Sequence, residues 1–353
     1  MTRQFLWGFL SLGMLLNVCP TILYADEMPT VKVSNVRRVF HNGEHNAFTD
    51  MVRFQGRYYL TFRSCPEGHM IHPTASVIIL ASDDLQMWQQ VHRFRVKRRD
   101  TRDPHFLVFQ ERLFVYTGTW YSGENSLDPS LYDMNHHLGY AAWTADGEKW
   151  HSPIMLDGTF GHYIWRAATY GGKAYLCGRR KLEFEIDGKG EGREIESLML
   201  ESEDGLIWRK KAIFQPIEGD ETAFAFEDDG SVLAIGRGFG REPAQVLRAQ
   251  KPWIEWDRVP LDRYIGGPLL VRWGERWVVG GRRLAGPKTL MYWLVENQLH
   301  EFAELPSGGD TSYPGFIALS PTRAVMSWYS SHEHDAGGNQ ITAIYLADLE
   351  IHD

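Results

Sequence analysis

Acidic and phenolic side chains recur in this sequence at the start of short apolar segments that are typical of β-strands. The four residues are Asp50, Asp103, Glu221 and Tyr313. A carboxylate can take up or deliver a proton, and a phenol becomes a nucleophile when a neighbouring carboxylate removes its proton. If the segments meet in the folded chain, these residues are candidates for the acid, base and nucleophile of one catalytic site.

Arginine recurs in the same parts of the sequence, either within these segments or near the end of the apolar segment that follows. The six candidates are Arg63, Arg102, Arg166, Arg179, Arg237 and Arg282. Because a guanidinium holds a carboxylate through two parallel hydrogen bonds, we predict that these arginines bind an acidic substrate. The alternative is a structural network in which they pair with Asp50, Asp103 and Glu221.

A turn with one fixed spacing shows how the segments are organised. It places a Ser or Thr, then an Asp, then a Trp in the ranges 82–88, 144–150 and 202–208. The hydroxyl and the carboxylate can accept hydrogen bonds from backbone N–H groups of the turn, and the Trp can cover apolar surface. Gly147 and Gly205 supply the positive φ that such a turn requires. A period of about 60 residues indicates that one β unit is copied along the chain.

Six copies of the unit can be counted from their first strands. These are expected near 48–52, 102–106, 164–168, 220–224, 266–270 and 311–315, each followed by a short turn and another apolar segment. No long segment has a helical period, so the sequence predicts an all-β chain, and six copies predict a six-bladed β-propeller in residues 26–353. We expect residues 31–40 to complete the last blade and close the ring. The turns of the fourth to sixth units, at 250–256, 296–302 and 347–351, are degenerate.

The repeated Ser/Thr-x-Asp-x-x-x-Trp turns resemble the Asp-box, or BNR, repeats of the sialidases, which are six-bladed propellers. The resemblance in repeat layout covers nearly the whole chain after residue 25. Asp220-Glu221, Asp229-Gly230 and Gly236-Arg237 resemble the fourth-blade pattern of that family. The resemblance implies that Tyr313 is the nucleophile, that Glu221 activates it, and that Arg237 binds the sugar carboxylate.

The sequence departs from the sialidase pattern at three places, so it resembles a divergent member. The first-blade motif that carries a carboxylate-binding Arg is replaced by Phe48-Thr49-Asp50-Met51, and Arg63 is a candidate substitute for that Arg. Tyr313 is followed by Pro314 rather than by a small hydroxyl residue. The loop that carries the general acid of sialidases contains no Asp. The candidates for that role are Glu67, His69, His72, Asp50 and Asp103.

Three functions are compatible with these residues. The first is an exo-acting, sialidase-like glycoside hydrolase that removes a terminal acidic sugar from a glycan. The second is a uronate polysaccharide lyase, in which Arg neutralises the carboxylate and Tyr or His abstracts the α proton. The third is a glycan-binding propeller without catalysis. We expect no cofactor, and no metal, since the segment 332–335 has ligand-type residues without a fixed spacing.

The composition sets further expectations. The formal net charge of −8 over 353 residues does not favour nucleic-acid binding. Arg3 precedes an apolar stretch at 5–18, which predicts a cleaved signal peptide in residues 1–25 and a secreted or periplasmic protein. No stretch reaches the ~20 apolar residues of a membrane span. Two cysteines remain after residue 25, Cys65 and Cys177, and we expect separate buried thiols rather than a disulfide.

Overall fold

The computed structural model describes residues 1, 28–182 and 194–352, so nearly all of the expected signal peptide lies outside the described residues. In the described part the chain forms six four-stranded antiparallel sheets and no α-helix. Two short 3₁₀ turns, η1 (Pro129–Leu131) and η2 (Met134–His136), interrupt the loop between two strands of the second sheet. Among the described residues there is no helix of the length and apolarity that a membrane crossing needs.

The six sheets follow the chain as blades one to six. The first three contain β2 (His45–Phe54), β3 (Arg57–Cys65), β4 (Ser76–Ser82) and β5 (Gln89–Phe94); β6 (Arg99–Phe109), β7 (Arg112–Tyr121), β8 (Leu138–Thr144) and β9 (Trp150–Met155); and β10 (Tyr163–Tyr170), β11 (Lys173–Lys181), β12 (Ile195–Ser202) and β13 (Arg209–Gln215). Blades four and five contain β14 (Thr222–Phe226), β15 (Val232–Gly236), β16 (Gln245–Ala249) and β17 (Asp257–Pro260); and β18 (Gly266–Trp273), β19 (Arg276–Arg283), β20 (Lys288–Val295) and β21 (Gln298–Glu304). Blade six contains β22 (Thr311–Ala318), β23 (Arg323–His334), β24 (Gln340–His352) and β1 (Thr30–Phe40).

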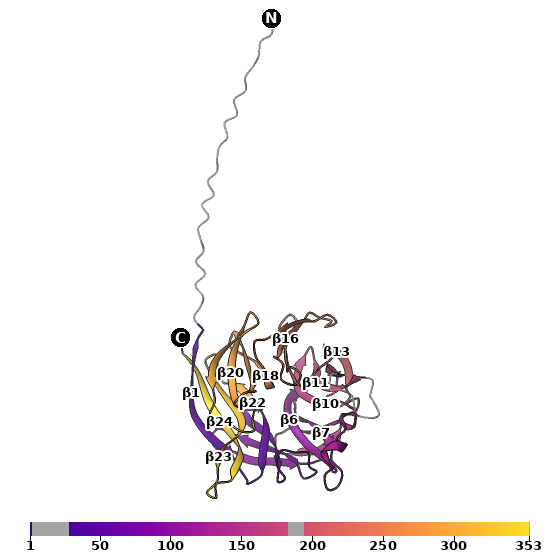
Figure 1. Cartoon of the computed structure of the whole chain (residues 1–353), viewed down its shortest axis with the longest axis vertical. Helices are drawn as coiled ribbons and strands as arrows, with labels where there is room; N and C mark the ends of the chain where they lie inside the picture. The colour runs from indigo at the N-terminus through magenta and orange to yellow at the C-terminus, as the bar shows by residue number, and fades with distance from the viewer. Residues whose placement is uncertain (2–27, 183–193, 353) are drawn as a thin grey trace.

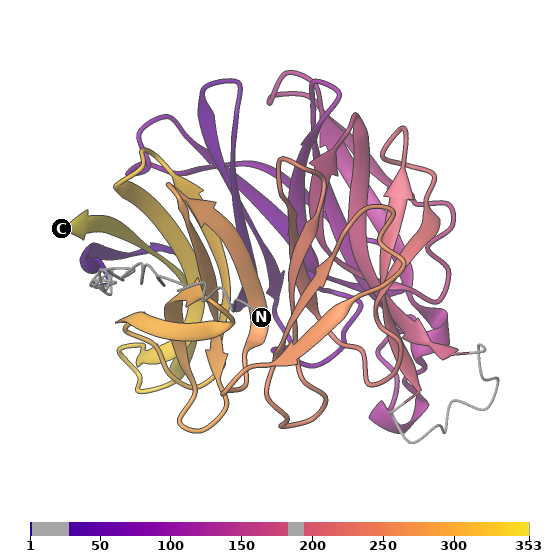
Figure 2. The same ribbon diagram turned by 90° about the horizontal axis from the view of Figure 1, so that it is seen from above.

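The two ends of the described chain share blade six. Strand β1 pairs antiparallel with β24, from Thr30 opposite His352 to Phe40 opposite Ile344, and Figures 1 and 2 show the two strands side by side. The sheet edge of β24 is therefore paired rather than open, as the sequence predicted. The prediction of a degenerate turn at 347–351 was wrong. These residues lie inside β24, because the fourth strand of this blade comes from the other end of the chain.

The first strands of the six blades contact one another in a closed ring, β2, β6, β10, β14, β18 and β22, and β22 contacts β2 again. The fold is therefore the all-β, six-bladed propeller that the repeat count predicted. Most of the core lies between neighbouring blades, as where Leu107 and Tyr116 of blade two pack with Leu176 and Leu200 of blade three. Cys65 and Cys177 are buried free thiols in different blades, as expected.

The three repeated turns have the predicted hydrogen bonds. In the third turn Ser202 Oγ accepts from the N–H of Gly205 at 2.9 Å, and Asp204 Oδ1 accepts from Leu206 and Ile207 at 2.8 and 2.9 Å. The other two turns repeat this pattern, and the residue after the Asp has positive φ in all three. Trp208 is 2% exposed and lies edge-on to Tyr116, with the ring centroids 5.5 Å apart. The Trp thus fixes the turn of one blade onto the preceding blade.

Trp208→Ala is expected to lower the free energy of unfolding by about 3 kcal/mol. The value is at the lower end for a buried aromatic side chain because the indole N–H has no hydrogen-bond partner among the described residues. Urea unfolding followed by tryptophan fluorescence measures the change. Normal stability in this variant combined with lost ligand binding would show that this turn belongs to a binding site instead.

Candidate functional site

The ring of first strands carries a repeated β-bulge. In five of the six, two consecutive residues stand opposite a single residue of the second strand. The five pairs are Phe48-Thr49, Asp103-Pro104, Trp165-Arg166, Gly267-Pro268 and Tyr313-Pro314. The first residue has positive φ in four of them, between 51° and 65°. A bulge re-aims a side chain out of the regular alternation, and Phe48, Asp103 and Tyr313 consequently line one pocket.

The bulge explains the Pro314 that departs from the sialidase pattern. Three of the five bulges have Pro at the second position, where the residue need not donate to the strand ladder. The bulge of blade five makes room for Tyr313. A Cβ atom on Gly267 would lie 2.7 Å from the Tyr313 ring, so only glycine fits against it.

The pocket has a volume of about 490 Å³, within the range of small-molecule sites. Its lining comes from all six blades. The chemically relevant members are His69, Arg102, Asp103, Trp120, Tyr163, Arg179, Glu221, Arg237, Arg282, Asp310 and Tyr313. A larger hollow of about 810 Å³ lies on blade four, around the turn from β16 to β17. We place the candidate site at the smaller pocket, because there the buried charged groups converge.

Tyr313 and Glu221 form the central pair of the pocket. The Tyr313 hydroxyl donates to Glu221 Oε1 at 2.7 Å, as a nucleophile and its base require. Glu221 Oε2 accepts from Arg237 at 2.8 Å and from the N–H of Gly267 at 3.1 Å. Burial raises the pKa of Glu221, but Arg237, Arg179 and the Tyr313 hydrogen bond together lower it to about 2. Burial and the Glu221 charge hold the pKa of Tyr313 well above its usual range, so the proton rests on the phenol until a reaction draws it off.

Four of the six predicted arginines, Arg102, Arg179, Arg237 and Arg282, line the pocket. Asp220 links two of them, since it pairs with Arg179 and lies 3.3 Å from Arg237 Nε. Arg282 has the longest contacts of the four, 3.5 Å to the Thr311 carbonyl and 3.7 Å to Asp310. These four guanidinium groups can hold an anionic ligand beside the Tyr313 hydroxyl.

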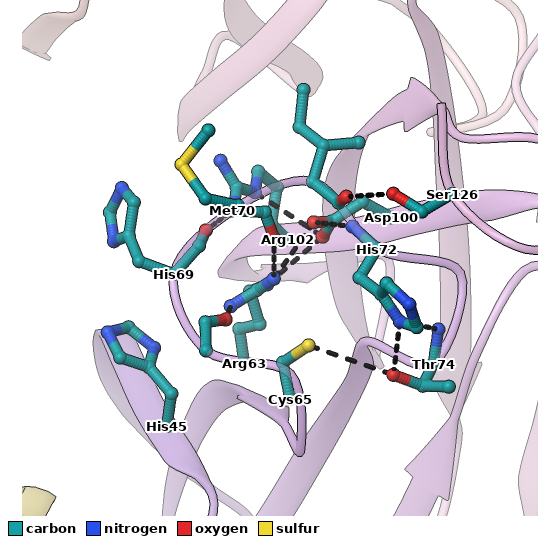
Figure 3. A network of polar contacts seen from close by, with 12 residues as sticks. His45, Arg63, Cys65, His69, Met70, His72, Thr74, Asp100, Arg102 and Ser126 are labelled. Carbon is teal, nitrogen blue, oxygen red and sulfur yellow. Dashed lines mark hydrogen bonds and ion pairs between the residues drawn. The ribbon is translucent and has the colours of Figure 1, made fainter. Parts of the chain in front are cut away.

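The other two arginines and Asp50, which the sequence analysis also placed in the site, do not line this pocket. Arg63 is fully buried and donates to both carboxylate oxygens of Asp100, at 3.0 and 2.8 Å, and to the carbonyls of Gly68 and Met70 (Figure 3). It therefore cannot substitute for the missing carboxylate anchor, and Arg102, which lies 3.3 Å from the same Asp100, lines the pocket instead.

Arg166 and Asp50 are a structural pair of the kind that the alternative interpretation described. Arg166 is the second residue of its bulge, so its side chain leaves the pocket and donates to Asp50 at 3.1 Å. It also donates to the carbonyls of Pro268 and Pro314, at 3.3 and 2.7 Å. Asp50 in turn accepts from the N–H of Phe106 at 2.8 Å. The pair connects the bulges of several blades beneath the pocket.

Asp103 lies in the pocket as predicted, although it is only 4% exposed. Tyr163 donates to its Oδ2, while its buried Oδ1 has no partner among the described residues. Burial and the nearby Glu221 charge outweigh Arg102 and raise the pKa of Asp103 to about 6. An unpartnered carboxyl oxygen in a pocket is suited to a ligand hydroxyl.

Asp103→Asn is expected to stabilise the protein more at pH 7.5 than at pH 4. A carboxyl whose pKa is raised on folding, from 3.8 to about 6, costs stability as the pH rises through that interval. The amide removes this cost, and Asn tolerates the positive φ of the site. Urea midpoints of the parent and the variant at the two pH values measure the difference. Equal differences at both pH values would contradict the raised pKa.

The sequence did not indicate the part of the pocket formed by His45, Asp310 and Tyr329. Asp310 Oδ2 accepts from His45 Nε2 at 2.9 Å and from His69 Nδ1 at 2.7 Å, and Tyr329 donates to Oδ1 at 2.8 Å. One signal could have revealed Asp310, because Gly309-Asp310 precedes β22 as Gly219-Asp220 precedes β14.

A metal ion is a second interpretation of this group. The ligand atoms of His45, His69 and Asp310 lie within 4.8 Å of one another. However, Arg282 lies 3.7 Å from the carboxylate, and its positive charge disfavours a divalent cation there. We therefore describe the group as a hydrogen-bonded network.

The remaining candidates have other positions. His72 bonds Thr74 at 2.7 Å and does not line the pocket, and Glu67 is solvent-exposed. Trp120 lines the pocket. Its ring centroid lies 6.2 Å from that of Tyr132, which belongs to the loop 122–137 and does not line the pocket. Asp335 accepts backbone hydrogen bonds within its own turn, from Gly337 and Asn339.

No family model matches the chain, and no curated protein matches its sequence. Solved structures of similar fold include a Dyadobacter fermentans protein of unknown function, at 17% identity and a TM-score of 0.74, covering 92% of this chain and 100% of that one. The Trypanosoma rangeli sialidase in complex with sialic acid is 12% identical with a TM-score of 0.64, over 90% of this chain and 59% of that one. A family 117 glycoside hydrolase of Zobellia galactanivorans is 11% identical with a TM-score of 0.52, over 91% of this chain and 90% of that one. At these identities the similarity establishes a sialidase-like fold.

Proposed function

We propose that this protein is an exo-acting glycoside hydrolase that removes a terminal acidic sugar from a glycan, with Tyr313 as nucleophile and Glu221 as its base. The observation that carries the proposal is the 2.7 Å hydrogen bond between the two side chains at the floor of the pocket. Sialidases with a Tyr nucleophile are an established exception to the paired-carboxylate scheme of glycosidases. A neutral phenol also approaches an anionic sugar without the charge repulsion that a carboxylate would meet.

The arginines support an acidic sugar. Arg179, Arg237 and Arg282 come from three successive blades and surround the Tyr313 side of the pocket. Arg237 and Arg179 are already paired with acidic side chains, so Arg282 has the most free N–H groups to offer a carboxylate. A pocket of about 490 Å³ can hold one sugar residue at the end of a chain, which supports exo-action.

The first chemical step follows from these contacts. The Tyr313 oxygen bonds to the anomeric carbon as the bond to the leaving group breaks, and the phenol proton passes to Glu221. The leaving-group oxygen keeps the electron pair of the broken bond and takes up one proton. Water then attacks the glycosyl–Tyr313 intermediate and gives up one proton, and the phenolate recovers its proton from Glu221. Arg237 and the Gly267 N–H both donate to Glu221 Oε2, so Oε1 is the oxygen left to take the Tyr313 proton.

The proposal also includes export, with residues 1–25 as a cleaved signal peptide. N-terminal sequencing of the protein secreted by its natural host, or by an expression host with a secretory pathway, tests this part by itself. A mature protein that retains residues 2–25 would contradict it.

The activity is tested by incubating the purified protein with aryl glycosides of acidic and neutral sugars and with acidic polysaccharides. A hydrolase releases the terminal sugar and the aryl alcohol. A uronate lyase would instead give products with a new ultraviolet absorbance, and a binding protein would leave its ligand unchanged. Either of those two outcomes overturns the proposal.

Arg282→Gln is expected to lower kcat/KM for an acidic-sugar glycoside by about 10- to 100-fold, since one charge-assisted hydrogen bond is lost. The corresponding neutral glycoside should change little, because it has no carboxylate to lose. Steady-state kinetics on the two substrates give the comparison. Equal losses on both would show that Arg282 does not recognise a carboxylate.

A further inference from the structure

We propose that His69 is the acid that protonates the leaving group, and that Asp310 is the positioning residue that orients its imidazole. The inference rests on the proposed hydrolase function and identifies the proton donor that such a reaction needs.

Three contacts fix His69 at the mouth of the pocket. Its Nδ1 lies 2.7 Å from Asp310 Oδ2, and Arg102 donates to its backbone carbonyl at 2.6 Å. Its ring also lies edge-on to Phe48, the bulge residue of blade one, with centroids 5.8 Å apart. No described residue hydrogen-bonds its Nε2. With Nδ1 occupied, Nε2 is the nitrogen that can give a proton to a ligand.

The surroundings of the Asp310 carboxylate keep it in place to orient the His69 imidazole through Nδ1. Burial raises the pKa of Asp310, but the hydrogen bonds from His45 and His69 outweigh it and hold the pKa far below its usual range. Tyr329 donates to the other oxygen of this carboxylate, and Arg282 lies 3.7 Å from it. His45 shares Oδ2, but burial lowers its pKa, and its buried Nδ1 has no partner among the described residues. The side chain of His45 is 10% exposed and that of His69 is 47% exposed, so His69 is the imidazole of the pair that is more open to a ligand.

The position of His69 fits the bond to be broken. In an exo-acting enzyme the terminal sugar fills the pocket, and the leaving-group oxygen lies between it and the solvent. The side chain of His69 is 47% exposed. Asp103, the other candidate that lines the pocket, is 4% exposed and already paired with Tyr163, so it is less accessible than His69 to a leaving-group oxygen at the solvent side. Figure 3 shows the rings of His45 and His69 on one side of Arg63, away from His72.

The step is balanced within these residues. The Nε2 proton of His69 passes to the glycosidic oxygen, which keeps the electron pair of the breaking bond and leaves as an alcohol. Neutral His69 then takes a proton from the water that attacks the glycosyl–Tyr313 intermediate. One water is consumed, and both His69 and Glu221 return to their starting states.

Leaving-group chemistry tests the role of His69. We expect His69→Gln to lose about 10²- to 10⁴-fold in kcat on the phenyl or alkyl glycoside of the sugar that the enzyme cleaves. On the 2,4-dinitrophenyl glycoside it should lose less than about 10-fold, because that leaving group departs without protonation. His72→Gln is the matched control, since it lies in the same loop but outside the pocket, and it should retain activity on both substrates.

Asp310→Asn tests the positioning role through the same pair of glycosides. Without the carboxylate that orients Nδ1, the variant should lose activity on the phenyl or alkyl glycoside and lose less than about 10-fold on the 2,4-dinitrophenyl glycoside, as His69→Gln does. Equal losses on both glycosides in either variant, or no loss on either glycoside in Asp310→Asn, would overturn the proposal. Abolition of parent activity by EDTA would also overturn it, in favour of a metal. A parent protein that cleaves neither glycoside overturns the proposed function, and this inference with it.

Discussion

Tyr313→Phe is expected to lower kcat by on the order of 10⁴-fold or more while ligand affinity stays within a few-fold of the parent. The substitution removes only the oxygen that forms the new bond, and the ring still packs against Phe48, Trp165 and Gly267. Steady-state kinetics on an activated acidic glycoside and calorimetric titration with the free sugar measure the two quantities.

Glu221→Gln should show a loss of comparable size, and the double variant should lose little more. Residues that act as one unit are not additive, because removing either member already disables the step. Tyr175→Phe is a matched control. Tyr175 also donates to a glutamate, Glu201, at 2.9 Å, but lies outside the pocket, so its variant should keep full activity. Turnover near the parent level in Tyr313→Phe would remove the nucleophile from the proposed mechanism.

Arg63→Met is expected to lower the free energy of unfolding by about 4 kcal/mol, because it leaves the Asp100 carboxylate buried without its main partner. Both side chains of this ion pair are 0% exposed. Arg102 remains 3.3 Å from Asp100 and offsets part of the loss. Urea unfolding at neutral pH measures the change.

Arg57→Met is the control for this prediction. Arg57 lies on the same strand, β3, and pairs with Asp83 at 2.7 Å, but the two side chains are 34% and 78% exposed. Water solvates the charges of an exposed pair, so this variant should change stability by less than about 1 kcal/mol. If Arg63→Met were as stable as Arg57→Met but bound ligand poorly, the original prediction of Arg63 as a substrate-binding residue would be restored.

The sequence alone determined the features that depend on local chemistry. The hydroxyl and carboxylate of each repeated turn lie within three residues of the N–H groups that they bind, so Ser202 and Asp204 specify that turn without help from the rest of the chain. Short apolar segments without a helical period determined the all-β class, and counting them gave six blades. The resemblance to sialidases selected Tyr313 and Glu221, whose side chains the structure brings to 2.7 Å.

Only the tertiary structure decided which polar side chains share the pocket. The direction of a side chain in a strand alternates, and a bulge shifts that alternation by one residue, so Asp103 and Tyr313 enter the pocket while Arg166 leaves it. Arg63 and Arg102 both donate to one buried carboxylate, Asp100, and the packing of blades one and two decides that only Arg102 also lines the pocket. Asp310 and His69, which are hydrogen-bonded in the pocket, are 241 residues apart in the sequence. Contacts of that range depend on the closure of the ring, which no local pattern of residues encodes.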